Sequence, residues 1–222
     1  MFQLYADSTP NARKVSIMLE EIKENYQVSL IDIDKGDQFR EDFKKISPFS
    51  KIPVLKNLKT GESYFESGAI LIYLANYCGD FYGENKDLTN QWLMIQMAYV
   101  GPMIGQHHQF HHYHPGKSSF GEERYFQIAK TIYERLDNHL SHNEYLAKTY
   151  SIADIANWCW IRIHFWGGTK VEGLSNLEAW LERLEKRPAC QKGIAVPHAI
   201  DFKELAADLE SKDSAVRNLV TK

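Results

Sequence analysis

The sequence predicts a protein of two parts: an α/β domain over residues 1–79 and an all-helical domain over residues 88–222, joined by a linker at 80–87. Apolar, strand-like runs alternate with helical periodicity only in the first part. There, Lys59-Thr60-Gly61-Glu62 has the composition of a turn that joins two short strands as a hairpin. After the polar, glycine-bearing linker the strand signals stop, and only helical spacing continues.

The first domain is predicted to contain a small sheet with its elements in the order β-α-β-α-β-β-α. Its first helix has Thr9 as the N-cap and Pro10 at the favoured first helical position. A βαβ unit followed by a hairpin is the order of a thioredoxin-like sheet. We expect the strands at residues 3–5, 27–33, 53–55 and 64–65, the first two helices at 10–22 and 40–46, and a third helix that follows Ser67 and ends at Cys78-Gly79.

The second domain shows helical spacing only. Residues 151–154, Ser-Ile-Ala-Asp, have the form of a capping box with Asp in the Glu/Gln position. The helix that follows is apolar nearly all round, which predicts burial. We expect helices at 91–109, 122–140, 151–165 and 177–186, and a further one at 203–211 within the charged tail.

Composition and charge exclude several functional classes. A formal net charge of −3 over 222 residues gives no reason to expect nucleic acid or an anionic membrane as a partner. The apolar runs are far shorter than the roughly 20 residues that span a bilayer, and the N-terminus lacks the pattern of a signal peptide. Cys78, Cys159 and Cys190 are widely spaced, which indicates neither a disulfide framework nor a structural zinc site. We therefore expect a cytoplasmic protein.

Residues 64–68, Tyr-Phe-Glu-Ser-Gly, lie where the hairpin gives way to a helix. Ser67 suits the N-cap position, and a helix N-terminus offers free N–H groups and the positive end of the helix dipole. A carboxylate ligand would fit there, with Glu66 beside it to meet an ammonium. One kind of molecule carries both groups on one carbon: an α-amino acid end, as in the γ-glutamyl part of glutathione.

Pro53 begins the first strand of the hairpin, although proline has no N–H to give to a sheet. The position suggests a cis Ile52-Pro53 bond, which would turn the main-chain N–H and C=O of Ile52 outward to pair with an extended peptide. An ordinary turn proline is the alternative, since about 5–6% of X-Pro bonds are cis.

The order of these features resembles the cytosolic glutathione transferases over nearly the whole chain. Within that family the sequence is similar to the nu class and the related Ure2-like disulfide-bond oxidoreductases, and residues 151–156 resemble the family's buried capping motif. The resemblance implies the glutathione transferase fold, in which the proline at position 53 is cis. The strings that carry it are Thr9-Pro10-Asn11, Gly36-Asp37-Gln38-Phe39-Arg40, Ile46-Ser47-Pro48, Lys51-Ile52-Pro53, Phe65-Glu66-Ser67-Gly68-Ala69-Ile70 and Gly101-Pro102-Met103-Ile104-Gly105-Gln106.

The resemblance implies a glutathione site built from these strings. Glu66 and Ser67 would hold the γ-glutamyl end, and Ile52, beside Pro53, would pair its main chain with the cysteinyl unit. No permanently bound cofactor is implied, because glutathione enters as a substrate.

Three further residues are implied at the edges of this site. Gln38 and Lys51 would lie toward the glycine carboxylate, and Arg124 would reach a glutathione held by the partner subunit of a homodimer. For Lys51 and Arg124 a solvated surface cation is an equal alternative.

The thiol of glutathione needs a donor that lowers its pKa from about 8.5. Thr9 and Asn11 bracket the start of the first helix, where thioredoxins carry their reactive cysteines, and the nu class uses these two positions for the sulfur. Simple capping is the alternative role of Thr9. Tyr5 and Ser8 are rivals, because other classes use Tyr or Ser near the end of the first strand; we interpret Tyr5 as a core residue.

The histidines at 107, 108, 111, 112 and 114 form an unusual cluster. Pairs at i,i+4 can chelate a metal on a helix, but the cluster contains no Cys, Asp or Glu to complete a ligand set, so we expect no metal site. By the resemblance, the cluster is a polar, aromatic wall of the pocket for the second substrate.

Two functions of different kind follow. The first is a glutathione-dependent enzyme that reduces disulfides through the sulfur of bound glutathione, with conjugation of a small electrophile as a side activity. The second is a non-catalytic binding or regulatory protein of the same fold. The complete set Thr9, Asn11, Glu66 and Ser67 favours the enzyme.

Overall fold

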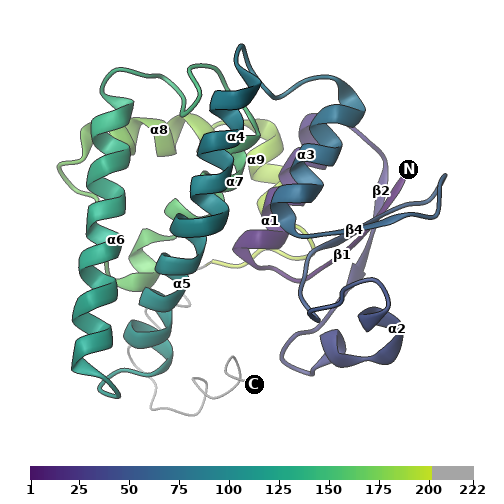
Figure 1. Ribbon diagram of the computed structural model, residues 1–222, viewed down its shortest axis with the longest axis horizontal. Helices are drawn as coiled ribbons and strands as arrows, with labels where there is room; N and C mark the ends of the chain where they lie inside the picture. Colours follow the sequence, from purple (N-terminus) through teal and green to yellow (C-terminus); the bar gives the residue numbers. More distant parts are fainter. Residues whose placement is uncertain (202–222) are drawn as a thin grey trace. The chain divides into compact units, whose positions relative to one another are not determined.

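The computed structural model describes residues 1–201, which form two compact units (Figure 1). Unit 1 comprises residues 1–82 and 185–200, and unit 2 comprises residues 83–184. The α/β class of the first part and the helical class of the second are as the sequence predicts. Residues 185–200 belong to unit 1 although we assigned them to the helical domain; the boundaries at 79 and 88 stay a prediction. The helix expected at 203–211 lies outside the described residues.

Unit 1 contains a four-stranded sheet in the order β2-β1-β3-β4. The first two strands pair in parallel, and the other pairs are antiparallel. Along β1 the residues Phe2, Leu4 and Ala6 are buried and alternate with half-buried ones, so one face of this strand points into the core. The strands are β1 (Phe2–Ala6), β2 (Tyr26–Leu30), β3 (Val54–Asn57) and β4 (Ser63–Phe65).

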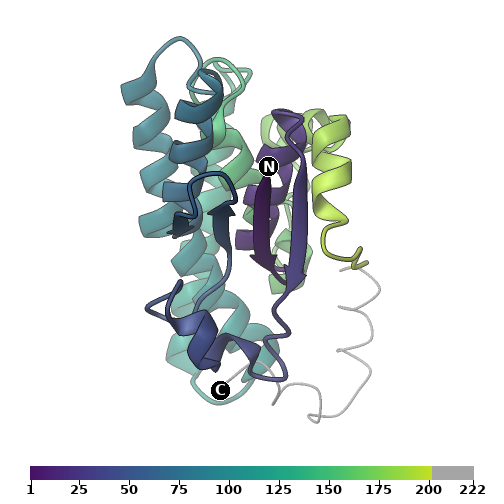
Figure 2. The same cartoon turned by 90° about the vertical axis from the view of Figure 1, so that its right-hand side faces the viewer.

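Three longer helices and two short helical segments complete unit 1. They are α1 (Pro10–Glu21), the 3₁₀ turn η1 (Asp37–Phe39), α2 (Glu41–Lys44), α3 (Ser67–Cys78) and α9 (Pro188–Ile194). Helix α1 packs against both α3 and α9. Figure 2 shows the strands of unit 1, with the yellow-green α9 among its helices.

Helix α9 was not predicted, and it lies unusually close to α1. A Cβ atom on Gly193 would come within 2.6 Å of the Ile17 main chain, so only glycine fits there. At the same contact the buried Ser16 hydroxyl donates a hydrogen bond to the Gly193 carbonyl, 2.7 Å away. The Arg187 guanidinium also makes a two-bond ion pair with the Glu21 carboxylate, at 2.8 and 3.1 Å.

Unit 2 is helical throughout its regular structure. Residues 86–113 form one helical run, which we predicted to begin at 91; it includes two π turns, η2 and η3, that helical periodicity does not predict. The elements are α4 (Lys86–Ile95), η2 (Gln96–Val100), α5 (Gly101–His108), η3 (Gln109–Tyr113), α6 (Ser119–Leu140), α7 (Ile152–Ile161), η4 (His164–Gly167) and α8 (Ser175–Glu185). Within residues 1–201, none of the helices is long and apolar enough to cross a membrane.

The core of unit 2 is organised around the capping box of α7, which is confirmed. Ser151 caps the helix, and the carboxylate of Asp154 accepts hydrogen bonds from the main-chain N–H groups of Leu146 and Ser151. The same carboxylate accepts a bond from the indole of Trp180 at 3.0 Å. Burial raises the pKa of Asp154 to about 6, because the donors offset only part of the cost of placing a charge there. As predicted, α7 is buried nearly all round.

Candidate functional site

Three connections of unit 1 leave the sheet at the same end. The ladder pairs Tyr5 with Val54, and Val54 in turn with Phe65, so these three residues form one row across β1, β3 and β4. The chain after β1 leads to α1, the chain before β3 contains Ile52 and Pro53, and the chain after β4 leads to α3. The register therefore brings the predicted thiol site, the proline and Glu66–Ser67 to one edge of the sheet.

At the first connection, Thr9 is the N-cap of α1, as predicted. Its Oγ1 accepts the Ala12 N–H at 3.3 Å, which leaves the hydroxyl hydrogen for another acceptor. Thr9 and Asn11 are both half-buried at the start of the helix. The two alternative residues for the sulfur, Ser8 and Tyr5, make other contacts. The Ser8 hydroxyl donates to the His198 carbonyl at 2.7 Å, and Tyr5 packs against Phe43 in the core, as we expected.

At the second connection, the Ile52-Pro53 bond is cis. Pro53 is buried, Ile52 is half-buried, and Lys51 is exposed. Ser47 holds the turn in place, since its hydroxyl donates to the Lys51 carbonyl at 2.7 Å and accepts the Lys51 N–H at 2.9 Å. In the described part of the chain no hydrogen bond uses the main chain of Ile52, so its N–H and C=O are available to an extended peptide.

At the third connection, the prediction that Ser67 caps α3 is wrong by one residue. Helix α3 begins at Ser67, and the cap position is occupied by Glu66, whose side chain makes no capping bond. Glu66 has a φ of 67°, a left-handed conformation that costs a non-glycine residue of order 1–3 kcal/mol. Its side chain is exposed and makes no ion pair with residues 1–201, whereas Ser67 is buried. The first N–H groups of α3 and an acidic side chain thus lie together, which suits an α-amino acid end.

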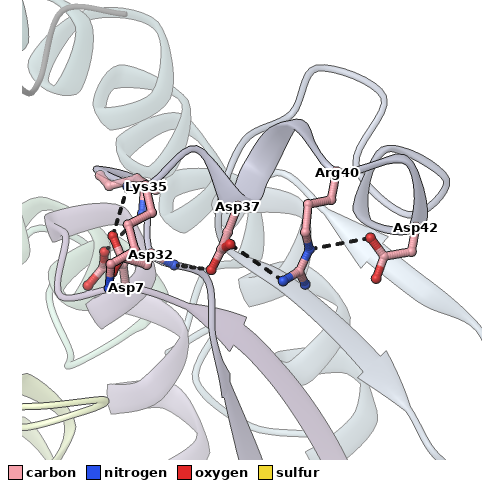
Figure 3. Close-up of polar contacts among 7 residues, drawn as sticks. Asp7, Asp32, Lys35, Asp37, Arg40 and Asp42 are labelled. Carbon is pink, nitrogen blue, oxygen red and sulfur yellow. Dashed lines mark hydrogen bonds and ion pairs between the residues drawn. The ribbon is translucent and has the colours of Figure 1, made fainter.

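Gln38 lies on η1, in a loop braced by a chain of ionic contacts (Figure 3). Its side-chain amide donates to the Ile33 carbonyl at 3.2 Å, and its Oε1 is buried without a hydrogen-bond partner among the residues that the structure describes. The Asp37 carboxylate accepts the Asp32 N–H at 3.1 Å and contacts Arg40 at 3.4 Å. The bracing holds η1 in position, and the second hydrogen of the Gln38 amide can still donate to a ligand.

At the start of this loop, Lys35 holds the side chain of Asp32 (Figure 3). Lys35 Nζ donates to the Asp32 carboxylate at 2.7 Å, and this bond lowers the pKa of Asp32 and raises that of Lys35. The Lys35 side chain is exposed and that of Asp32 is half-buried, so the pair orders the loop more than it stabilises the fold.

Arg124 and the histidines belong to unit 2 and are described apart from the sheet. Arg124 is exposed on α6. His107 and His108 are buried, and burial lowers the pKa of both. His107 Nε2 lies 2.7 Å from the Gly167 carbonyl. Across residues 1–201, no three His, Cys, Asp or Glu side chains come together in a way that could hold a metal ion.

One residue of this region was missed by the sequence reasoning. Lys14 is 1% exposed on α1, and its Nζ donates to Ser67 Oγ at 3.3 Å. The sequence did contain a signal, because Lys14 lies four residues before Met18 and therefore on the apolar face of the helix. A cation on such a face is costly unless it has polar partners inside the fold.

The fold and this edge define a class of protein: a thioredoxin-like sheet with a cis proline and two helix N-termini at the same end, followed by an all-helical unit. Family models agree with it. The model described as the glutathione S-transferase N-terminal domain matches residues 9–76, and the one for the C-terminal domain matches residues 108–188. The chain belongs to the glutathione S-transferase family.

Individual members of this family are similar to the chain over most of its length. The chain is 37% identical over 200 residues to the disulfide-bond oxidoreductase YfcG of Escherichia coli, covering 85% of this chain and 92% of that one. It is 33% identical over 210 residues to the disulfide-bond oxidoreductase YghU of the same organism, covering 86% of this chain and 73% of YghU. Among solved structures, the chain is similar to a glutathione transferase from Pseudomonas putida whose crystal structure has one glutathione disulfide bound per subunit. The two superpose with a TM-score of 0.82 at 36% identity, covering 88% of this chain and 91% of that one.

Proposed function

We propose that this protein is a glutathione-dependent enzyme of the nu class, which reduces disulfide bonds through the thiolate of bound glutathione. The observation that carries the proposal is the N-terminus of α1. It has the position of a thioredoxin-type thiol site, but Thr9 and Asn11 stand there in place of cysteines. The names of two relatives, both disulfide-bond oxidoreductases, support the same chemistry.

In this proposal each connection at the sheet edge has one task. The hydroxyl of Thr9 and the amide of Asn11 donate to the glutathione sulfur and stabilise the thiolate, together with the α1 dipole. The main chain of Ile52, preceding Pro53, pairs with the cysteinyl unit. Glu66 binds the ammonium of the γ-glutamyl end, and Ser67 with the first N–H groups of α3 binds its carboxylate.

The glycine end of the tripeptide is assigned to two side chains. Lys51 and the amide of Gln38 both lie on the connection between β2 and β3, Gln38 on η1 and Lys51 shortly before β3 begins. Lys51 is exposed and supplies a mobile positive charge for the carboxylate, and Gln38 is held by its loop. Exposure makes the Lys51 contact the weaker of the two in salt.

The reaction balances without a thiol from the protein. The glutathione thiolate attacks one sulfur of the disulfide, forms a mixed disulfide and releases the other sulfur as a thiolate, which takes a proton from water. A second glutathione thiolate then attacks the glutathione sulfur of the mixed disulfide, releasing the second substrate thiolate and leaving glutathione disulfide. Conjugation of a small electrophile would use the same first thiolate.

The protein's own cysteines are poorly placed for this role. Cys159 and Cys190 are buried. Burial is the usual outcome for a cysteine, and from the sequence we expect it of all three, but Cys78 is exposed. Cys78 is, however, the last residue of α3 and Ser67 the first, so the two lie about 16 Å apart along the helix axis at 1.5 Å per residue.

The test compares two sets of variants by turnover of hydroxyethyl disulfide at saturating glutathione. A folded variant with all three cysteines changed to serine or alanine should keep most of its activity, whereas Thr9→Ala and Asn11→Ala should lose rate with modest effects on stability. An inactive cysteine-free variant beside fully active Thr9 and Asn11 variants would overturn the proposal. Binding of glutathione without turnover of either a disulfide or a chlorodinitrobenzene-type electrophile would indicate a binding protein.

The proposal includes a homodimer, in which Arg124 reaches the glutathione of the partner subunit. Unit 2 supports it with an apolar hollow of about 190 Å³ next to exposed apolar side chains: Met94, Ile95 and Tyr99 are 46%, 41% and 39% exposed. The hollow is lined by Trp92, Ile95, Tyr99, Val100, Ile132, Arg135 and Leu136.

A cytoplasmic location is also part of the proposal. The support is that Cys78, Cys159 and Cys190 are all free thiols, the state that a reducing compartment maintains.

A further inference from the structure

Lys14 connects the two helices that begin at the sheet edge. It lies in the second turn of α1, which Thr9 caps and whose first turn carries Asn11, and it contacts the first residue of α3. Its side chain is 1% exposed and that of Ser67 is 6% exposed, so the contact is shielded from water. A charge-assisted hydrogen bond in such surroundings is stronger than one at the surface.

The direction of this bond determines the role of the Ser67 oxygen. An ammonium has three donors and no acceptor, so Lys14 Nζ must donate and Ser67 Oγ must accept. This bond does not use the hydroxyl hydrogen of Ser67. An oxygen that accepts from a cation also becomes a better donor, because the bond polarises its O–H group.

We propose that Lys14 is a positioning residue for the γ-glutamyl carboxylate of glutathione. It orients Ser67 so that the hydroxyl donates to that carboxylate, and it places a positive charge behind the anion. This inference rests on the proposed function, and it extends the site by one residue that touches no ligand itself. It also explains why a cation lies on the apolar face of α1, where Met18 and Leu19 are fully buried.

The test uses ligands that differ only at the γ-glutamyl end. Glutathione carries both the carboxylate and the ammonium, 4-aminobutyryl-cysteinylglycine lacks the carboxylate, and glutaryl-cysteinylglycine lacks the ammonium. Calorimetry on Lys14→Met should show an affinity for glutathione about tenfold lower than that of the unmodified protein. Its affinity for the aminobutyryl analogue should change less than twofold, because that ligand has no carboxylate to lose.

Two further variants separate positioning from folding. Lys14→Arg keeps the charge and a donor and should recover most of the glutathione affinity. Ser16→Ala is the matched control: it removes a buried hydrogen bond from the same helix, to Gly193, and should leave the ratio of the two affinities unchanged. If Lys14→Met does not fold, Lys14→Gln, which keeps a donor without the charge, takes its place with the same expected loss of selectivity.

The outcomes are distinct. Equal losses for glutathione and the aminobutyryl analogue would make Lys14 a purely structural residue and overturn the inference, as would an unchanged affinity for both. If the unmodified protein itself did not prefer glutathione to the aminobutyryl analogue, the γ-glutamyl assignment of Glu66 and Ser67 would fail first. A selective loss in Lys14→Met that Lys14→Arg restores would establish the role.

Discussion

Thr9 offers a sharp test of the proposed chemistry, because its side chain has two roles that can be measured separately. Its Oγ1 accepts the Ala12 N–H at 3.3 Å and so caps α1. In the proposed complex its hydroxyl hydrogen donates to the glutathione thiolate. Thr9→Val keeps the shape of the side chain and removes both bonds, whereas Thr9→Ser keeps both.

The magnitudes follow from the two bonds. Loss of the cap should lower the free energy of unfolding by about 1 kcal/mol. Loss of a hydrogen bond to a charged group costs about 1.5–3 kcal/mol, which raises the pKa of bound glutathione by about 1–2 units, since one unit is 1.36 kcal/mol. At a pH below the thiol pKa in the unmodified complex, the thiolate fraction of the variant is therefore about 10- to 100-fold lower. The more basic thiolate is a better nucleophile, with a Brønsted coefficient of about 0.4–0.5, so the rate should fall only about three- to tenfold.

The assay is the pH profile of hydroxyethyl disulfide turnover at saturating glutathione, with the thiolate of the bound ligand titrated by ultraviolet absorbance. The profile of Thr9→Val should shift to higher pH and meet or exceed that of the unmodified protein on the alkaline side. Ser118→Ala is the matched control, because Ser118 caps α6 through the Gly121 N–H at 3.1 Å and belongs to the other unit. A Thr9→Val profile that was lower by one factor at every pH, with no change in thiol pKa, would refute the assignment of Thr9 to the sulfur.

Three other predictions concern binding, pH and assembly. Glu66→Gln should weaken glutathione binding by about 1.5–3 kcal/mol with little loss of stability, because the exposed carboxylate contributes little to the fold; unchanged affinity by calorimetry would exclude the ammonium contact. The folded-state pKa of Asp154, about 6, lies above its ordinary value of 3.8, so its contribution to stability is fully present below about pH 4 and is lost as pH rises to about 6. The difference in unfolding free energy between the unmodified protein and Asp154→Asn should therefore shrink by on the order of 3 kcal/mol between pH 4 and 7 in urea titrations; a constant difference would contradict the raised pKa. Sedimentation should show a dimer of the 25.7 kDa chain at micromolar concentration, and a monomer would remove the role of Arg124 in the partner's site.

Local sequence signals predicted most of unit 1, and their errors have local causes. Strand alternation, the turn at 59–62 and the cap at Thr9 identified the sheet and α1, because each depends on neighbouring residues alone. The cap of α3 was placed one residue late. A Ser before an apolar helical run is the usual cap, but Glu66 adopts a positive φ that nothing in its side chain predicts. Such a conformation requires support from the surrounding structure, which a sequence does not display.

Contacts over long sequence separations were not predictable in the same way. The return of residues 185–200 to unit 1 depends on a single close approach, Gly193 on Ile17, across more than 170 positions of the chain. The sequence reasoning ended the preceding helix at residue 186 and assigned no helix to residues 188–194, so α9 was missed. The bond from Lys14 to Ser67 likewise joins two helices whose mutual packing appears only in the fold.

Lys14, which the sequence reasoning missed, gives α1 a second role in the proposed site. Thr9 at its start serves the thiol, and Lys14 serves the γ-glutamyl end through Ser67. The two positions are five residues apart, about 7.5 Å along a helix. Two residues of extended peptide span a comparable length, about 7 Å, which is of the order of the separation between the cysteinyl and γ-glutamyl units. One helix can therefore support both ends of this dipeptide at once, and α9 fixes its position through Ser16 and Ile17. A substitution at Gly193 should then weaken glutathione binding by displacing α1, although Gly193 is far in sequence from both Thr9 and Lys14.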